Sequence, residues 1–181
     1  MSHFTTGMVT MEVNDIRIIL EQDVDFSLLD DSQLLDILRK LGVGDHYRVL
    51  AMLPMLLVAW TDGKIHAVER EEIMKIANEH DYVDEENKDV LDAWLQQEPT
   101  PFYYKNGIRA LVELARRHQG LGSAMHVDEL RDIHRFSIQV GQAAHHFWEG
   151  DAKLSLEEDV ALDALRRLLN VDDGDSWAEI H

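Results

Sequence analysis

Apolar residues recur at three- and four-residue spacing along almost the whole chain of 181 residues, and this spacing limits the fold more than any other feature. Leu34, Leu38 and Leu41 show the period, as do Leu162 and Leu165. No segment alternates apolar and polar residues for long enough to predict a strand. The sequence therefore predicts an all-α fold, a single bundle-like domain of about seven helices. The expected helices cover residues 34–41, 45–60, 67–80, 84–97, 101–120, 123–149 and 156–169.

The domain organisation follows from the same pattern. Gly42 is placed to end the helix over 34–41 in a left-handed conformation. Pro54 lies inside the helix over 45–60 and should bend it, because proline lacks an amide donor and its ring collides with the preceding turn. We expect an N-terminal extension over 1–45 with one or two short helices packed on the domain, the helical domain over 46–170, and an acidic, disordered tail over 171–181.

The net charge of the chain limits the classes of partner that we expect it to bind. The chain carries 17 Lys and Arg against 35 Asp and Glu, which gives a formal charge of −18. Nucleic acids and anionic membrane surfaces are disfavoured, because both attract concentrated Lys and Arg. The acidic excess favours cations or basic protein partners instead. The absence of cysteine excludes disulfides, thiol nucleophiles and cysteine-bound metal centres.

Membrane insertion is not expected. The longest uncharged apolar run, residues 49–60, has 12 residues and is interrupted by Pro54, so it is too short to span a bilayer. Residues 1–10 lack the charged and apolar regions of a signal peptide. We therefore expect a soluble protein of the cytoplasm.

A short acidic motif occurs twice. Asp62-Gly63-Lys64-Ile65 is followed by Glu69, and Asp151-Ala152-Lys153-Leu154 is followed by Glu158, with both acidic positions offset by 89 residues. Each copy ends an apolar helix and begins an amphipathic one. The pattern predicts two related helical hairpins, each with an acidic turn.

The first copy is similar to the second half of an EF-hand loop, in which an aspartate and a glutamate seven residues apart bind calcium. Val58 and Trp60 occupy the positions of the first two oxygen ligands, so an ordinary EF-hand is excluded. Calcium needs six to eight oxygens, more than one copy supplies. A shared site would combine both copies, and its candidate metal ligands are Asp62, Glu69, Glu149, Asp151 and Glu158.

The sequence resembles the TerB-like family of bacterial tellurite resistance and related stress modules. The resemblance covers about residues 48–170 and is carried by Leu56-Leu57-Val58-Ala59-Trp60-Thr61-Asp62-Gly63 with Ile65, Glu69 and Ile73. The chain departs from the family at Trp60-Thr61, where small residues are usual. The resemblance implies two facing helical hairpins whose acidic turns bind a divalent cation, with Asp62 and Glu69 at the family positions.

The acidic residues also have an interpretation without metal. Ser155-x-x-Glu158 is a capping box, and Glu69 stands three residues after His66 in the same relation. Histidine-based metal chemistry is a further alternative, since His66, His126 and His146 each precede a glutamate by three residues. Di-iron bundles use the opposite order, Glu-x-x-His, which the chain lacks.

Three functions follow as hypotheses. The first is a non-enzymatic, TerB-like stress-response module that binds a divalent cation, calcium above all, together with a protein partner, a membrane-associated one included. The second is a metal-free acidic adaptor for a basic protein. The third is a His/carboxylate metalloenzyme.

The dibasic pairs Arg39-Lys40, Arg116-Arg117 and Arg166-Arg167 each fall in the last turn of a predicted helix, where cations stabilise the helix dipole.

Overall fold

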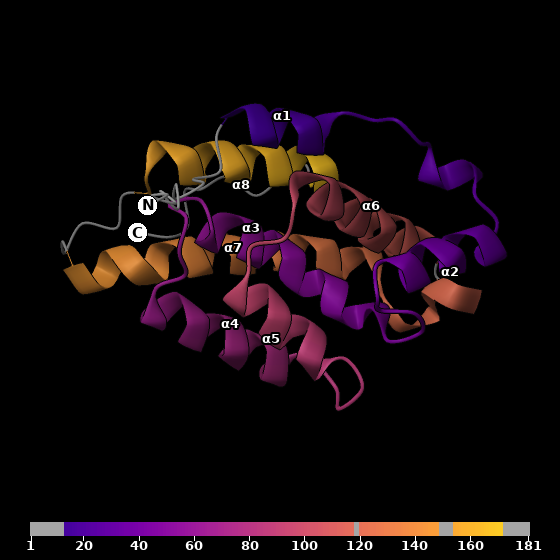
Figure 1. Cartoon of the computed structure of the whole chain (residues 1–181), viewed down its shortest axis with the longest axis horizontal. Helices are drawn as coiled ribbons and strands as arrows, with labels where there is room; N and C mark the ends of the chain where they lie inside the picture. Colours follow the sequence, from indigo (N-terminus) through magenta and orange to yellow (C-terminus); the bar gives the residue numbers. More distant parts are fainter. Residues whose placement is uncertain (1–12, 118–119, 149–153, 172–181) are drawn as a thin grey trace, which may run out of the picture.

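A computed structural model describes residues 13–117, 120–148 and 154–171. These residues form eight α-helices and three short 3₁₀ helices, with no strand among them, so the predicted all-α class is confirmed (Figure 1). The α-helices are α1 (Val13–Leu20), α2 (Asp31–Lys40), α3 (Leu53–Ala59), α4 (Ala67–Glu79), α5 (Lys88–Gln96), α6 (Pro101–Arg117), α7 (Val127–Trp148) and α8 (Leu156–Leu169). The 3₁₀ helices are η1 (Phe26–Leu28), η2 (Tyr47–Met52) and η3 (Gly120–Ala124).

Local signals in the sequence set several helix ends. Gly42 follows α2 with a φ of 79°, a conformation that glycine adopts without steric cost. Thr100 stands at the start of α6, where its Oγ1 accepts a hydrogen bond from the Tyr103 N–H at 3.2 Å. Asn170 ends α8 with a φ of 54°. Capping and glycine chemistry are short-range effects, and these ends therefore match the sequence prediction.

The predicted continuous helix over 45–60 is wrong. The segment divides into the 3₁₀ helix η2 and the α-helix α3, and Pro54 lies in the first turn of α3. A proline there interrupts no helical hydrogen bond, because the first amide groups of a helix have no partner within it. The chain thus accommodates Pro54 by starting a new helix instead of bending an old one.

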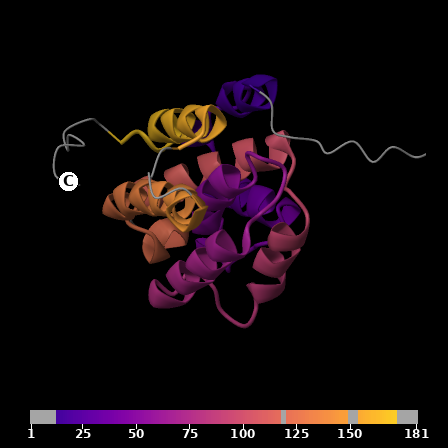
Figure 2. The same cartoon turned by 90° about the vertical axis from the view of Figure 1, so that its left-hand side faces the viewer.

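The core is built around the α3–α7 pair. Every residue of α3 is buried, and α7 packs along it (Figure 1). Helix α4 lies against α7 on one side, and α8 lies against α7 and α3 on the other (Figure 2). The α3–α7 pair therefore lies at the centre of the packing, with α4 and α8 against it.

Small residues let α7 approach α3 closely. Ser137, Val140 and Gly141 are buried on one face of α7. A Cβ atom added at Gly141 would lie 3.0 Å from Cγ1 of Val58 and 3.1 Å from Cδ2 of Leu154. These distances are tighter than ordinary carbon contacts, so the packing depends on glycine at this position.

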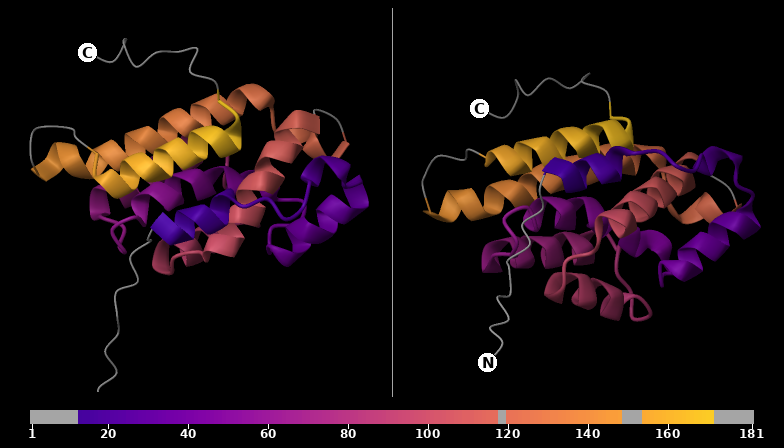
Figure 3. Two further views of the ribbon diagram at one scale, coloured as in Figure 1. Left: turned by 90° about the horizontal axis from the view of Figure 1, so that it is seen from above. Right: turned by 45° about the horizontal axis from the view of Figure 1, so that its top comes forward.

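Helix α1 lies beside α8 and across α6 (Figure 3). Ile16 and Ile19 are buried in that contact. Arg109 of α6 donates to the carbonyl oxygens of Leu20 and Glu21 at 3.1 and 3.0 Å, which satisfies the end of α1. The first described helix is therefore part of the common core.

Candidate functional site

Two capping glutamates occupy equivalent positions at the starts of α4 and α8. In α4 the N-cap is His66, whose backbone N–H donates to Oε2 of Glu69 at 2.7 Å. In α8 the N-cap is Ser155, whose N–H donates to Oε2 of Glu158 at 2.6 Å, while the Glu158 N–H donates to Ser155 Oγ at 3.2 Å. Both glutamates thus have the capping contacts that the sequence indicated.

Both glutamates are also buried, which capping alone does not require. Glu69 is 2% exposed and Glu158 is 5% exposed. The pKa of Glu69 is raised from 4.5 to about 8, mainly by burial and additionally by the negative charges of Asp62 and Glu158, against the opposing hydrogen bond from the His66 N–H. The charge of Glu158 acts on Glu69, so the two helix starts form one electrostatic unit.

Two histidines join this unit from neighbouring positions. Nε2 of His145, on α7, lies 2.8 Å from Oε2 of Glu158. Nε2 of His66 lies 2.8 Å from Oδ2 of Asp62, and Oδ1 of Asp62 accepts a hydrogen bond from the Lys64 N–H at 3.2 Å. Asp62 therefore stabilises its own turn at the exposed edge, while His145 reaches the buried carboxyl group from another helix.

The structure places some of the predicted site residues near one another, and others lie outside the residues that it describes. Asp62 and Glu158 both lie close enough to Glu69 for their charges to raise its pKa. Asp151 and Glu149 lie outside the described residues. His145 was not predicted as part of the site. No local signal identifies it, since its partner Glu158 is 13 residues away and the contact depends on how α7 packs against α8.

A second cluster of donor atoms lies elsewhere. His46, Asp84 and Glu86 are exposed, and one donor atom from each lies within 4.8 Å of the others, the one such group of three among the described residues. Nδ1 of His46 is 3.1 Å from Oδ2 of Asp84, a hydrogen bond that raises the pKa of His46. The sequence did not predict this cluster, because His46 and Asp84 are 38 residues apart.

The buried side chain of Asn87 fixes the geometry of that second cluster. Its Oδ1 accepts a hydrogen bond from the Asp84 N–H at 2.8 Å, and its Nδ2 donates to the His46 carbonyl oxygen at 3.0 Å. Asn87 is 1% exposed. One asparagine therefore joins the segment before η2 to the turn before α5.

Comparisons with protein-family models, with curated proteins and with solved structures each found no match to this chain. Membership of the TerB-like family accordingly stays a prediction that rests on the sequence motif. Within the described residues, no helix combines the length and the apolar character needed to cross a membrane.

Proposed function

We propose that this chain is a non-enzymatic, TerB-like module that binds a divalent cation where its two helical hairpins meet. The observation that carries the proposal is the burial of Glu69 beside the negative charges of Glu158 and Asp62. A buried carboxyl group either stays protonated, as the raised pKa of Glu69 indicates for the metal-free protein, or ionises when it is paired with a cation or bound to a metal ion. For Glu69 the described hydrogen bond comes from a backbone N–H, which leaves the second carboxylate oxygen available to a ligand.

Calcium is the favoured ion. Glu69, Glu158 and Asp62 offer hard carboxylate oxygens, and Asp151 and Glu149 are further candidates from the sequence repeat. Water and backbone carbonyl oxygens would complete the coordination. The imidazoles of His145 and His66 stand beside two of these carboxylates, which makes a transition metal the competing outcome of the experiment below.

Cation binding would regulate contact with a protein partner. The carboxylates belong to α4 and α8, which flank the central α3–α7 pair, so an ion between their first turns would fix one hairpin relative to the other. A basic partner suits the formal charge of −18. We place this role in the cytoplasm, in a stress response, on the strength of the sequence resemblance.

Calorimetry on chelator-treated protein tests the metal site directly. Calcium should bind, raise the melting temperature and change the fluorescence of Trp60, two residues before Asp62. Binding should also release protons at neutral pH, because Glu69 must ionise to coordinate metal; titrations in buffers of different ionisation enthalpy measure this release. E69Q and E158Q should each lose binding.

Matched controls separate this site from the alternatives. E71Q and E157Q change exposed glutamates next to the buried pair and should bind calcium like the unmodified protein. D84N should do the same; loss of binding in D84N alone would assign the ion to the His46 cluster instead. Absence of heat, proton release and stabilisation with calcium, zinc and manganese alike would overturn the metal proposal.

The second candidate is a metal-free adaptor, which the capping hydrogen bonds accepted by Glu69 and Glu158 favour. In that case partner binding weakens with salt and is unaffected by chelator. The third, a His/carboxylate metalloenzyme, requires a transition metal that stays bound through purification, which elemental analysis measures.

A further inference from the structure

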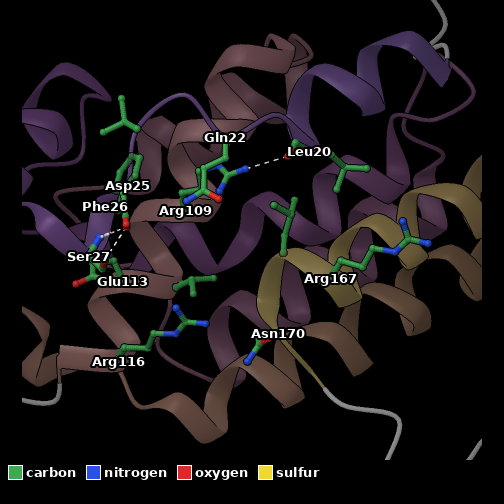
Figure 4. Close-up of a pocket in the computed structure, with 13 residues that line it drawn as sticks. Leu20, Gln22, Asp25, Phe26, Ser27, Arg109, Glu113, Arg116, Arg167 and Asn170 are labelled. Carbon is green, nitrogen blue, oxygen red and sulfur yellow. Dashed lines mark hydrogen bonds between the residues drawn. The ribbon is translucent and has the colours of Figure 1, made fainter.

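A hollow of about 500 Å³ lies at the other end of α8 from the buried glutamates. Helix α8 has 14 residues, which makes it about 20 Å long, so this hollow is separate from the proposed cation site. Its walls are the segment that follows α1, one face of α6 and the last turn of α8 (Figure 4). Its size is within the range of small-molecule sites.

Arginine side chains line this hollow in a strongly acidic protein. Arg109 and Arg116 stand on α6, and Figure 4 shows both reaching from that helix toward the hollow. The structure gives Arg116 no hydrogen bond or ion pair with another described residue. Nε of Arg109 is buried and has no hydrogen-bond partner among the described residues. A buried donor without an acceptor costs about 1–3 kcal/mol, which a ligand oxygen would recover once the guanidinium group turned toward the hollow.

The acidic residues on the wall do not compensate these two guanidinium groups. Oδ1 of Asp25 accepts hydrogen bonds from the N–H and the hydroxyl group of Ser27. Oε1 of Glu113 is 2.9 Å from Nε of Arg117. Each carboxylate is thus already engaged with a donor other than Arg109 or Arg116.

A role in stabilising the end of α6 does not account for Arg116 either. Its neighbour Arg117 already serves that last turn, bound to Glu113, to Asp31 at 2.5 Å and to the Leu29 carbonyl oxygen at 2.6 Å. Arg167, which also lines the hollow, is held by Asp163 at 2.5 Å. Arg116 differs from both, because its positive charge faces the hollow without a counter-charge.

Apolar side chains also line the hollow beside the two arginines. Val112 lies on the same face of α6, and Leu20, Phe26 and Leu168 come from the surrounding segments. A ligand that fits this arrangement carries a negative charge at one end and a short apolar body. Guanidinium groups hold carboxylate and phosphate oxygens in paired hydrogen bonds.

We propose that this hollow binds a small organic anion, a carboxylate or phosphate monoester on a short alkyl chain, through Arg109 and Arg116. The proposal does not depend on cation binding at Glu69. n-Hexyl phosphate and hexanoate serve as probes of the two head groups, with inorganic phosphate and n-hexanol as probes of each part alone. At least one of the two amphiphilic anions should bind more tightly than inorganic phosphate and hexanol.

Titrations of the full chain by calorimetry and by ¹H–¹⁵N NMR test the proposal. The Nε–H signal of Arg109 should shift on binding, because that donor gains an acceptor. R116Q should weaken binding about tenfold, the effect expected when one charge-assisted contact is lost, and R116E should abolish it. Arg116 is exposed, so both variants should keep the melting temperature of the unmodified protein.

Arg39 supplies the matched control, since it is an exposed arginine in the last turn of α2 and does not line the hollow. R39Q should bind the probes like the unmodified protein. Absence of binding by both anions at millimolar concentration would overturn the proposal. Equal binding by R116E and the unmodified protein, or an Arg109 signal that does not move, would overturn it as well.

Discussion

Glu69 and Glu158 lie 89 residues apart in the chain, yet each is the buried third residue of its helix and each accepts the N–H of its own N-cap residue. The charge of Glu158 also contributes to the raised pKa of Glu69. A capping interaction at a helix surface needs no burial. The pairing of two buried capping glutamates is therefore the feature that separates this chain from an ordinary helical bundle.

E69Q should stabilise the metal-free protein more at pH 8 than at pH 5. The pKa of Glu69 is about 8 in the folded protein and near 4.5 after unfolding. Between these values the unfolded chain releases a proton that the folded protein keeps, so stability falls as pH rises, by up to about 1.4 kcal/mol per pH unit. Glutamine does not titrate, so the stability of E69Q does not fall with pH in this way, and its side-chain oxygen can still accept the His66 N–H.

Thermal unfolding in chelator at a series of pH values measures this difference. The melting temperature of E69Q relative to the unmodified protein should increase from pH 5 to pH 8 and then level off. E71Q, which changes an exposed glutamate of the same helix, should give a difference independent of pH. An equal difference at pH 5 and pH 8 for E69Q would show that Glu69 titrates normally.

The two glutamates should be energetically coupled. E158Q removes one of the charges that raise the pKa of Glu69, so in this variant the pH dependence assigned to Glu69 should shift to lower pH. A double-mutant cycle with E69Q, E158Q and the combined variant should give a coupling energy of about 0.5–3 kcal/mol above pH 8. Additive effects throughout the pH range would mean that the two carboxyl groups act independently.

The sequence could predict the parts of this fold that depend on neighbouring residues. The bounds of α8, residues 156–169, match the prediction, because the Ser155 cap and the apolar period are both local. The capping roles of Glu69 and Glu158 were predicted for the same reason. Periodicity alone could not show that a new helix begins beside Pro54. A run in which nearly every residue is apolar does not distinguish a 3₁₀ helix from an α-helix.

Contacts between distant segments could not be predicted. His145 reaches Glu158 only because α7 and α8 pack as a hairpin, and His46 meets Asp84 only because two loops converge. The same holds for Arg116, whose dibasic motif predicted a role at a helix end but whose side chain faces a hollow formed by three separate segments. Such relationships depend on tertiary packing, which no spacing within one helix encodes.

N87A should destabilise the protein by about 1–3 kcal/mol, because it removes a buried side chain that hydrogen-bonds both Asp84 and His46. Loosening this junction should also lower the pKa of His46 toward 6.5, since the hydrogen bond that the His46 imidazole donates to Asp84 raises it. Urea unfolding and NMR titration of the imidazole measure the two effects. N106A, which removes a partly exposed asparagine from α6, should change stability by less than about 0.5 kcal/mol. An unchanged His46 pKa in N87A would show that Asn87 does not position the pair.

D23N and K105M should change stability in opposite directions. The Lys105 side chain is 4% exposed and pairs with Asp23, whose side chain is 64% exposed. D23N leaves the buried ammonium group without its counter-charge, and because Asp23 is solvent-screened the loss should be about 1 kcal/mol. K105M keeps the length of the buried side chain and removes the charge, so it should be neutral or stabilising. Urea unfolding at low and high salt measures the free energy of unfolding of both variants and shows which is the more stable. If K105M were the less stable of the two, the contact between the Lys105 ammonium group and the Phe102 ring, 5.7 Å from Nζ to the ring centre, would outweigh the cost of burying the charge.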